Sequence, residues 1–206
     1  RQPFRFLDLP AELRLRIYDE LLHVSKPIDL DPLNYHQIAP RLRLFLTCRQ
    51  IHHEAHHVFY RQPVRLYPTH GRFFHTKRAL LERLPAQYRR EITTLDLRLG
   101  PGWSAPPRNQ HTRAELGLAD CANLRRLRVF IEIDPSERTF DGFRGKNATE
   151  DTYLRFCLGL LDGVFAQCPG LHEVEFDAYP AVGRDAPLLT GLVARVAECG
   201  RRVAWG

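Results

Sequence analysis

Apolar residues recur at helical spacing near the start of the chain. Leu13, Ile17 and Leu21 follow one another every fourth residue, behind a proline and a glutamate of the kind that suits a first helical turn. The opposite face is charged and carries Arg14, Arg16, Asp19 and Glu20. The pattern predicts a helix that begins near residue 9 and ends before Pro27, with a loop to about Pro40.

A second helix is predicted from about Arg41 to Tyr60. When its residues are placed 100° apart around a helical wheel, one narrow stripe is fully apolar. The stripe consists of Leu44, Cys48, Ile51, Ala55, Val58 and Phe59. A stripe of this kind packs against another element of structure.

The second half of the chain repeats one short pattern, in which an apolar residue and two intervening residues are followed by alternating apolar positions. The pattern occupies residues 92–99, 124–131 and 171–176, with a shortened copy at 199–205. Helical patterns at residues 149–165 and 185–196 precede the last two copies. Strands that alternate with helices form a parallel sheet with right-handed crossovers, so the predicted fold class is α/β. The intervals are irregular, which indicates a short, degenerate solenoid.

Two runs in the first half carry a resemblance to a known family. They are Leu9-Pro10-x-Glu12-Leu13-x-x-x-Ile17-x-x-x-Leu21 and Leu46-Thr47-Cys48-Arg49. Their spacing resembles an F-box, and the continuation to Tyr60 resembles the F-box-like domains of filamentous fungi. In those domains a strand, a helix and a further strand follow. The candidates here are Pro63–Tyr67, Thr76–Leu84 and Ile92–Leu99.

The repeated strands resemble the leucine-rich-repeat strands of F-box proteins, in which a helix that ends in cysteine turns into a short strand. The resemblance implies an F-box-like helical segment at residues 1–60, packed on an irregular leucine-rich-repeat-like α/β domain at residues 61–206. We expect the two to fold as one cooperative unit.

The F-box resemblance also implies a binding function. It implies that the first helix docks a Skp-type adaptor of cullin-based ubiquitin ligases through Leu9, Pro10, Leu13, Ile17 and Leu21. The residues themselves leave a second possibility open, in which the same side chains pack inside this chain. We expect an intermediate case, with Ile17 and Leu21 internal and the Leu9-Pro10 turn accessible.

Loops that leave parallel strands emerge at one edge of the sheet, where open α/β sheets bind their partners. Three of these loops carry aromatic and arginine side chains, which anchor many interfaces. The side chains are Trp103, Phe140, Phe143, Arg144, Tyr179 and Arg184. We expect them to contact a protein target; the alternative is that the aromatic rings fold back over the sheet edge.

Residues 53–57 satisfy the H-E-x-x-H pattern of zinc proteases, in which two histidines bind zinc and a glutamate activates water. On the helical wheel His53 and His57 both point away from the apolar stripe, and no third ligand stands at a recognisable spacing. We therefore expect both to be exposed, and we predict no metal, no cofactor and no enzymatic activity. Incidental metal binding by His52/His56 or His53/His57 remains an alternative.

The net charge of +6 comes from the first half of the chain, and residues 61–90 are its most basic part. The basic patch predicted there consists of Arg61, Arg65, Arg72, Lys77 and Arg78. Such a patch favours nucleic acid or an acidic protein, and Tyr67, Phe73 and Phe74 could stack on bases. A solvated arginine-rich surface explains the same composition.

Five cysteines, odd in number and without a C-x-x-C pair, indicate reduced thiols and an intracellular protein, cytoplasmic or nuclear. No apolar run is long enough to span a membrane, and no secretory signal opens the sequence. Three functions stay open: a substrate-recognition subunit of a cullin-type ubiquitin ligase, an F-box-derived scaffold or assembly factor without a ligase role, and a nucleic-acid binder.

Overall fold

The computed structural model describes residues 4–29, 35–68, 81–100, 116–144 and 148–206. Its strands are β1 (Ile28–Asp29), β2 (Val64–Leu66), β3 (Thr94–Leu99), β4 (Arg126–Ile131), β5 (Glu173–Ala178) and β6 (Arg202–Trp205). Its α-helices are α1 (Ala11–Leu22), α2 (Tyr35–Leu42), α3 (Arg49–Tyr60), α4 (Ala86–Glu91), α6 (Asp151–Gln167) and α7 (Pro187–Glu198). The α/β class predicted from the sequence is confirmed.

All six strands are parallel and stand in the sheet in the order in which they occur in the chain. Leu95, Leu127 and Val174 are aligned across the central strands, and each is fully buried. The alternating apolar positions of the repeat therefore point to one face of the sheet. Burial of a side chain of this size stabilises the fold by about 1.5–3 kcal/mol.

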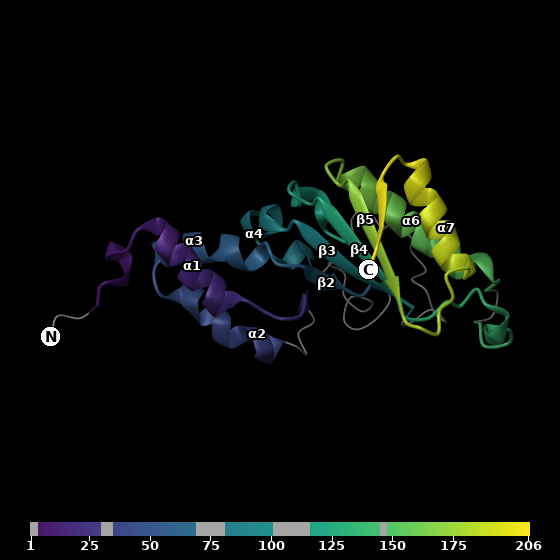
Figure 1. Ribbon diagram of the computed structural model, residues 1–206, viewed down its shortest axis with the longest axis horizontal. Coiled ribbons are helices and arrows are strands. Elements are labelled where there is room, and N and C mark those ends of the chain that lie inside the picture. Colours follow the sequence, from purple (N-terminus) through teal and green to yellow (C-terminus); the bar gives the residue numbers. More distant parts are fainter. Residues whose placement is uncertain (1–3, 30–34, 69–80, 101–115, 145–147) are drawn as a thin grey trace.

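Helices α6 and α7 lie against one side of the sheet at the end of the molecule remote from α1 (Figure 1). A buried carboxylate fixes the start of α7, because the Oδ2 atom of Asp134 accepts a 2.8 Å hydrogen bond from the backbone N–H of Leu188. Its Oδ1 atom accepts a second bond, also 2.8 Å, from the N–H of Ser136. The loop after β4 is thereby fastened to the last helix.

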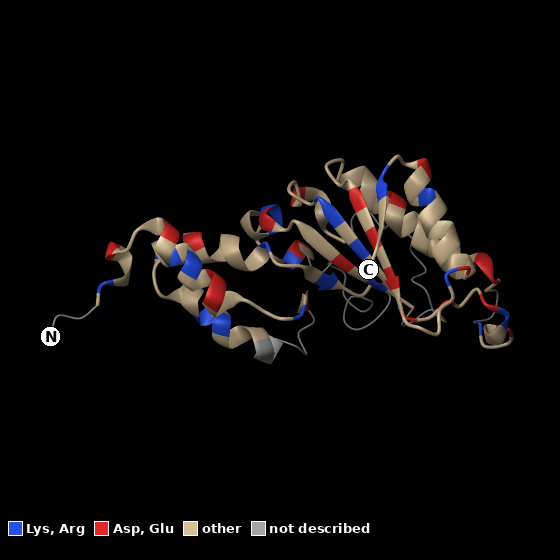
Figure 2. Cartoon of the chain, viewed as in Figure 1, with Lys and Arg blue, Asp and Glu red and all other residues tan. Residues whose placement is uncertain are grey.

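The opposite face of the sheet is charged. Arg128 of β4 pairs with Glu175 of β5 at 3.2 Å, and Arg126 pairs with Glu173 at 2.5 Å. Figure 2 shows β4 in the blue of basic residues beside β5 in the red of acidic ones. A parallel sheet is usually covered by helices on both faces, and cross-strand ion pairs make this second face compatible with water.

The helical segment and the repeat domain share one sheet. β1 belongs to the first sixty residues, and its Ile28 is aligned with Val64 of β2. One apolar core also joins Tyr18 and Phe59 to the buried leucines of the strands. The cooperative unfolding of residues 1–60 with 61–206 stays a prediction.

The predicted second helix is wrong in its bounds. Residues 35–42 form α2 and Arg43–Leu46 form a 3₁₀ turn, so the loop expected up to Pro40 is helical in its second half. The chain then breaks at Cys48, which is extended at φ −159°, and its Sγ atom accepts a 3.5 Å hydrogen bond from the N–H of Ile51. Cys48 thus caps α3.

Two further elements were not predicted, namely β1 and α4. The expected strand at Pro63–Tyr67 is β2. Most of the expected helix at Thr76–Leu84 lies outside the described residues, and Leu81–Arg83 forms a 3₁₀ turn.

Cys121, Cys157 and Cys168 are buried free thiols, as expected from their apolar surroundings. Burial raises the pKa of Cys121 to about 12 and that of Cys168 to about 11, which makes both thiols unreactive. Among the helices that the structure describes, none combines the length and the apolar character needed to cross a bilayer.

Candidate functional site

Helix α1 turns its leucines outward. Leu13 is 44 % exposed and Leu21 is 57 % exposed, while Ile17 is half-buried. The face that packs against α3 carries Tyr18 and Leu22, which are almost fully buried. The apolar stripe that the sequence singled out is therefore a surface, with Leu9 half-buried and Pro10 exposed at its start.

A polar cluster holds α1 on α3. The carboxylate of Glu54 accepts hydrogen bonds from Nε and Nη2 of Arg14 at 2.9 and 2.7 Å, and a third from the hydroxyl of Tyr18 at 2.9 Å. Gln50 donates a fourth from within α3 at 3.1 Å. Arg14 also donates to the carbonyl of Leu9, so the same guanidinium fixes the turn before α1.

The cluster has clear electrostatic consequences. The hydrogen bonds from Arg14 lower the pKa of Glu54 to about 2. Burial, with the neighbouring carboxylate, raises the pKa of Tyr18 to about 12. At neutral pH the carboxylate is charged and the phenol is neutral, so the arginine and the tyrosine both act as donors to one acceptor.

Two expectations about α1 are wrong. Arg14 was assigned to the solvated face but is only 8 % exposed, because Glu54 provides a partner for it on α3. Leu21 was expected inside and lies outside, because Tyr18 and Leu22 occupy the contact with α3 instead. Helical periodicity alone does not reveal that a buried ion pair with α3 occupies this face of α1.

Other exposed apolar side chains lie near α1 in the sequence. Among the described residues, the large apolar side chains exposed before residue 50 are Phe4, Leu7, Leu13, Leu15, Leu21 and Leu46. Leu46, from the second F-box-like run, is 84 % exposed. Leu15 and Leu46 were not named as binding residues by the sequence reasoning, although both stand in the F-box-like runs.

The predicted target-binding residues divide into several groups. Phe143 is 74 % exposed, Tyr179 is 49 % exposed and Arg184 is exposed, all in loops that follow β4 or β5. Phe140 is half-buried, and Trp103 lies outside the described residues. The exposed members are available to a partner at the carboxyl edge of the strands.

Arg144 is unavailable, because it holds its own loop together. Its guanidinium donates to the carbonyls of Pro135 and Glu137, each at 2.8 Å, and to the carboxylate of Asp141 at 2.6 Å. The sequence reasoning missed Trp205 of β6, which is 51 % exposed and has the guanidinium of Arg184 over its ring at 5.6 Å.

The structure describes two residues of the predicted basic patch, and each has an acidic side chain beside it. Arg65 is half-buried and pairs with Asp96 of β3 at 3.1 Å, so its charge is neutralised within the sheet. Arg61 is exposed and lies 3.7 Å from Glu91. Arg72, Lys77 and Arg78 lie outside the described residues, as do Phe73 and Phe74.

The H-E-x-x-H motif does not have the geometry of a zinc protease. Its glutamate, Glu54, is bound to Arg14 and Tyr18 on the α1 side of the helix. His53 is exposed as expected, but His57 is half-buried, because its Nδ1 atom lies 2.9 Å from the Glu91 carboxylate. The expectation that both would be exposed is therefore wrong for His57.

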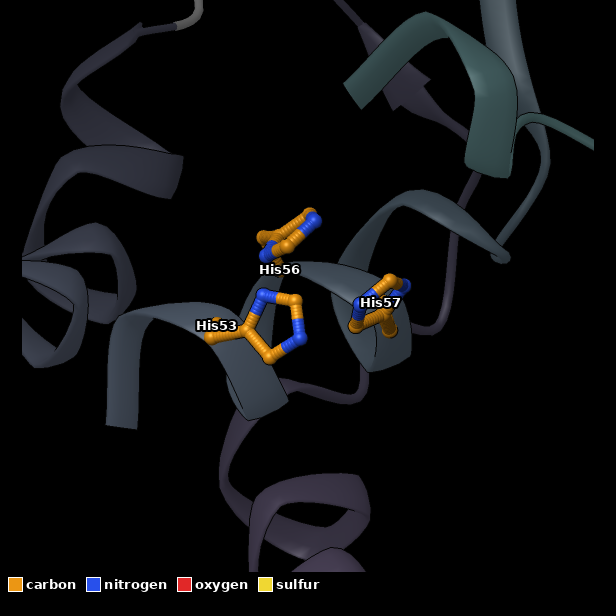
Figure 3. A group of neighbouring side chains, drawn as sticks. All are labelled: His53, His56 and His57. Carbon is orange, nitrogen blue, oxygen red and sulfur yellow. The ribbon is translucent and has the colours of Figure 1, made fainter. Parts of the chain in front are cut away.

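Three histidines, namely the pair in the H-E-x-x-H motif and His56, lie close together on α3. Figure 3 shows the imidazoles of His53, His56 and His57 gathered along one side of α3. Each offers a nitrogen, and the three nitrogens lie within 4.8 Å of one another. His56 is 3 % exposed, and burial lowers its pKa, so its ring is neutral at pH 7.

The sequence reasoning placed His56 only in a pair with His52. The ring of His52 is committed elsewhere: its Nδ1 atom lies 3.1 Å from the carbonyl oxygen of Phe45, and its Nε2 atom lies 2.7 Å from the hydroxyl of Tyr88. His56 is buried beside α4, where the ring centre of Tyr88 lies 5.2 Å from that of His56 at a tilt of 42°.

No protein-family model, curated protein or solved structure matches this chain. The candidate site therefore stands on its geometry and on the sequence motifs.

Proposed function

We propose that the chain is a protein-interaction adaptor of the F-box type, the substrate-recognition subunit of a cullin-based ubiquitin ligase. In this function the outer face of α1 docks a Skp-type adaptor, and the loops at the carboxyl edge of the strands contact the target. The supporting observation is the exposure of Leu13 and Leu21 on a helix that is anchored through its other face.

Two observations favour the interpretation that the exposed leucines of α1 form a binding surface. Arg14 and Tyr18 both donate to Glu54 of α3, and these bonds fix the rotation of α1 with Leu13 and Leu21 outward. Amphipathic helices also dock into hydrophobic grooves through one apolar face, on which residues at i, i+4 and i+8 lie together. Leu13, Ile17 and Leu21 have that spacing.

The nucleic-acid alternative receives less support. Phosphate contacts require basic side chains with free donors, and the described Arg65 uses its donors on Asp96. The scaffold alternative differs from the ligase function only in its partner, so the same experiment separates the two.

The experiment replaces Leu13 and Leu21 together by aspartate and measures binding to a purified Skp-type adaptor by calorimetry. We expect binding to be lost, since two charges would enter an apolar contact. The unfolding midpoint should change little, because exposed positions tolerate substitution within about 0.5 kcal/mol each. A matched control is Phe143→Asp, also an exposed apolar residue but in the loop after β4.

Wild-type affinity in the folded double variant would overturn the docking assignment. If the wild-type chain fails to bind the adaptor at all, the ligase function is wrong and the scaffold function replaces it. Equal loss with Phe143→Asp would assign docking to the sheet edge instead of α1.

A further inference from the structure

We propose that His53, His56 and His57 form a binding site for a transition-metal ion of the zinc type on α3. The site lies on α3, is independent of the docking function of α1, and departs from the sequence-based expectation that the chain binds no metal. It differs from the H-E-x-x-H motif, since it includes His56 and leaves out Glu54.

The spacing of the three histidines suits a shared ion. Residues at i, i+3 and i+4 lie next to one another on a helix surface. Ligand nitrogens around a tetrahedral zinc ion lie about 3.4 Å apart, given bonds of about 2.0–2.1 Å. One nitrogen of each ring already lies within 4.8 Å of the other two, so the three side chains stand close to the separation that a shared ion requires.

Two of the rings are held in the form that a metal requires. A carbonyl oxygen only accepts hydrogen bonds, so the 2.9 Å contact of His56 Nδ1 with the carbonyl of His52 places the ring proton on Nδ1. The carboxylate of Glu91 does the same for Nδ1 of His57 at 2.9 Å. In both rings Nε2 is then the nitrogen with a lone pair, as in metal-bound histidines whose other nitrogen donates to a carbonyl or carboxylate.

The neighbouring histidine gives an internal contrast. Both nitrogens of His52 have partners of their own, the carbonyl of Phe45 and the hydroxyl of Tyr88. His52 therefore stabilises the contact between α3 and α4 and is not a ligand. Three imidazoles without a thiolate suit zinc, nickel or copper, and three protein ligands leave a fourth position for water.

The ion would also strengthen the junction of two regions. All three ligands lie on α3, but Glu91, which orients His57, is the last residue of α4, just before β3. A bound ion would order His57 and with it the contact between the helical segment and the sheet. We therefore expect metal to raise the thermal unfolding midpoint of the chain.

The test is a calorimetric titration of the untagged, metal-free chain with Zn²⁺, together with the absorption spectrum of the Co²⁺ form. We expect one Zn²⁺ per chain and the intense visible bands of four-coordinate cobalt. His53→Ala and His57→Ala should each weaken Zn²⁺ binding by at least about tenfold, because outer partners alone contribute about 10- to 100-fold. Glu91→Gln should fall within that outer-partner range.

His172→Ala is the matched control, an exposed histidine just before β5, and it should bind Zn²⁺ like the wild type. His53 is exposed, so His53→Ala should fold normally and remain informative even if substitution of the buried His56 does not yield folded protein. The proposal is overturned if no saturable Zn²⁺ binding occurs, if the stoichiometry is well below one, or if His53→Ala and His172→Ala behave alike.

Discussion

The helix α1 and the strand β3 distribute leucine and charge in opposite ways. In β3, Leu95 and Leu97 are buried, and Asp96 between them faces the charged side of the sheet. In α1, the ion-paired Arg14 is buried and Leu21 is exposed. Both elements place apolar side chains in the core, Tyr18 and Leu22 in the case of α1, but α1 also leaves Leu13 and Leu21 in water.

The two regions also differ in how their apolar side chains are covered. The sheet covers its apolar face with its own helices and neutralises its other face with cross-strand ion pairs (Figure 2). Helix α1 contacts α3 through the buried Tyr18 and Leu22 and through the hydrogen bonds of Glu54, and it leaves several leucines in water. Exposed apolar side chains on a folded surface are typical of interaction sites, which supports the docking face that we propose on α1.

The sharpest test of this comparison uses one substitution in both regions. Leu95→Ala should destabilise the chain by about 2–5 kcal/mol, because a fully buried leucine leaves a cavity. Leu21→Ala should change the free energy of unfolding by about 0.5 kcal/mol or less, because the side chain is largely in water. Urea denaturation measures both, and similar losses from the two variants would contradict the comparison.

A second test addresses the polar contact between α1 and α3 through pH. The carboxyl of Glu54 titrates near 4.5 when unfolded and at about 2 when folded, because Arg14 stabilises the charged form. Its contribution is therefore complete above about pH 4.5 and is lost as the pH falls toward 2. We expect Glu54→Gln to be less stable than the wild type at pH 7, with the difference shrinking below pH 4.5.

The measurement is the urea midpoint of both proteins between pH 7 and pH 2.5. Other carboxylates titrate in both proteins and cancel in the difference. A difference between the two proteins that does not vary with pH would show that Glu54 does not hold α1 through its charge.

The smallest effect is expected on the charged face of the sheet. Arg128→Ala removes a cross-strand pair whose arginine is 39 % exposed, so the loss should be about 0–1 kcal/mol. Since salt screens such pairs, the difference between variant and wild type should disappear at high ionic strength. A loss that persists in high salt would mean that Arg128 stabilises the sheet by packing rather than by charge.

The sheet was predictable from sequence because strand periodicity is local. The alternation of apolar and polar residues predicts that Leu95, Leu127 and Val174 share one face of the sheet. In the structure the three residues are aligned in adjacent strands. β1 was not predictable, since two residues give no period. The helical patterns at residues 149–165 and 185–196 correspond to α6 and α7 within two residues at each end.

The candidate site was predictable only in part, because it depends on long-range pairing. The sequence identified Leu13 and Leu21 but not the direction in which they point. That direction is decided by Glu54, forty residues after Arg14 in the chain. His56 was missed for the same reason. A helical wheel of α3 shows that helix alone, and it cannot show that Tyr88 of α4 lies against His56.

The order of the strands has a consequence for how the chain can fold. Each strand pairs with the strand before it, from β1 to β6, and none is inserted between two earlier ones. During synthesis the N-terminus leaves the ribosome first. Each new strand would therefore emerge after the strand with which it pairs. Growth at one edge also means that no finished pairing has to open to admit a later strand, so the sheet can assemble during synthesis in the order in which it is encoded.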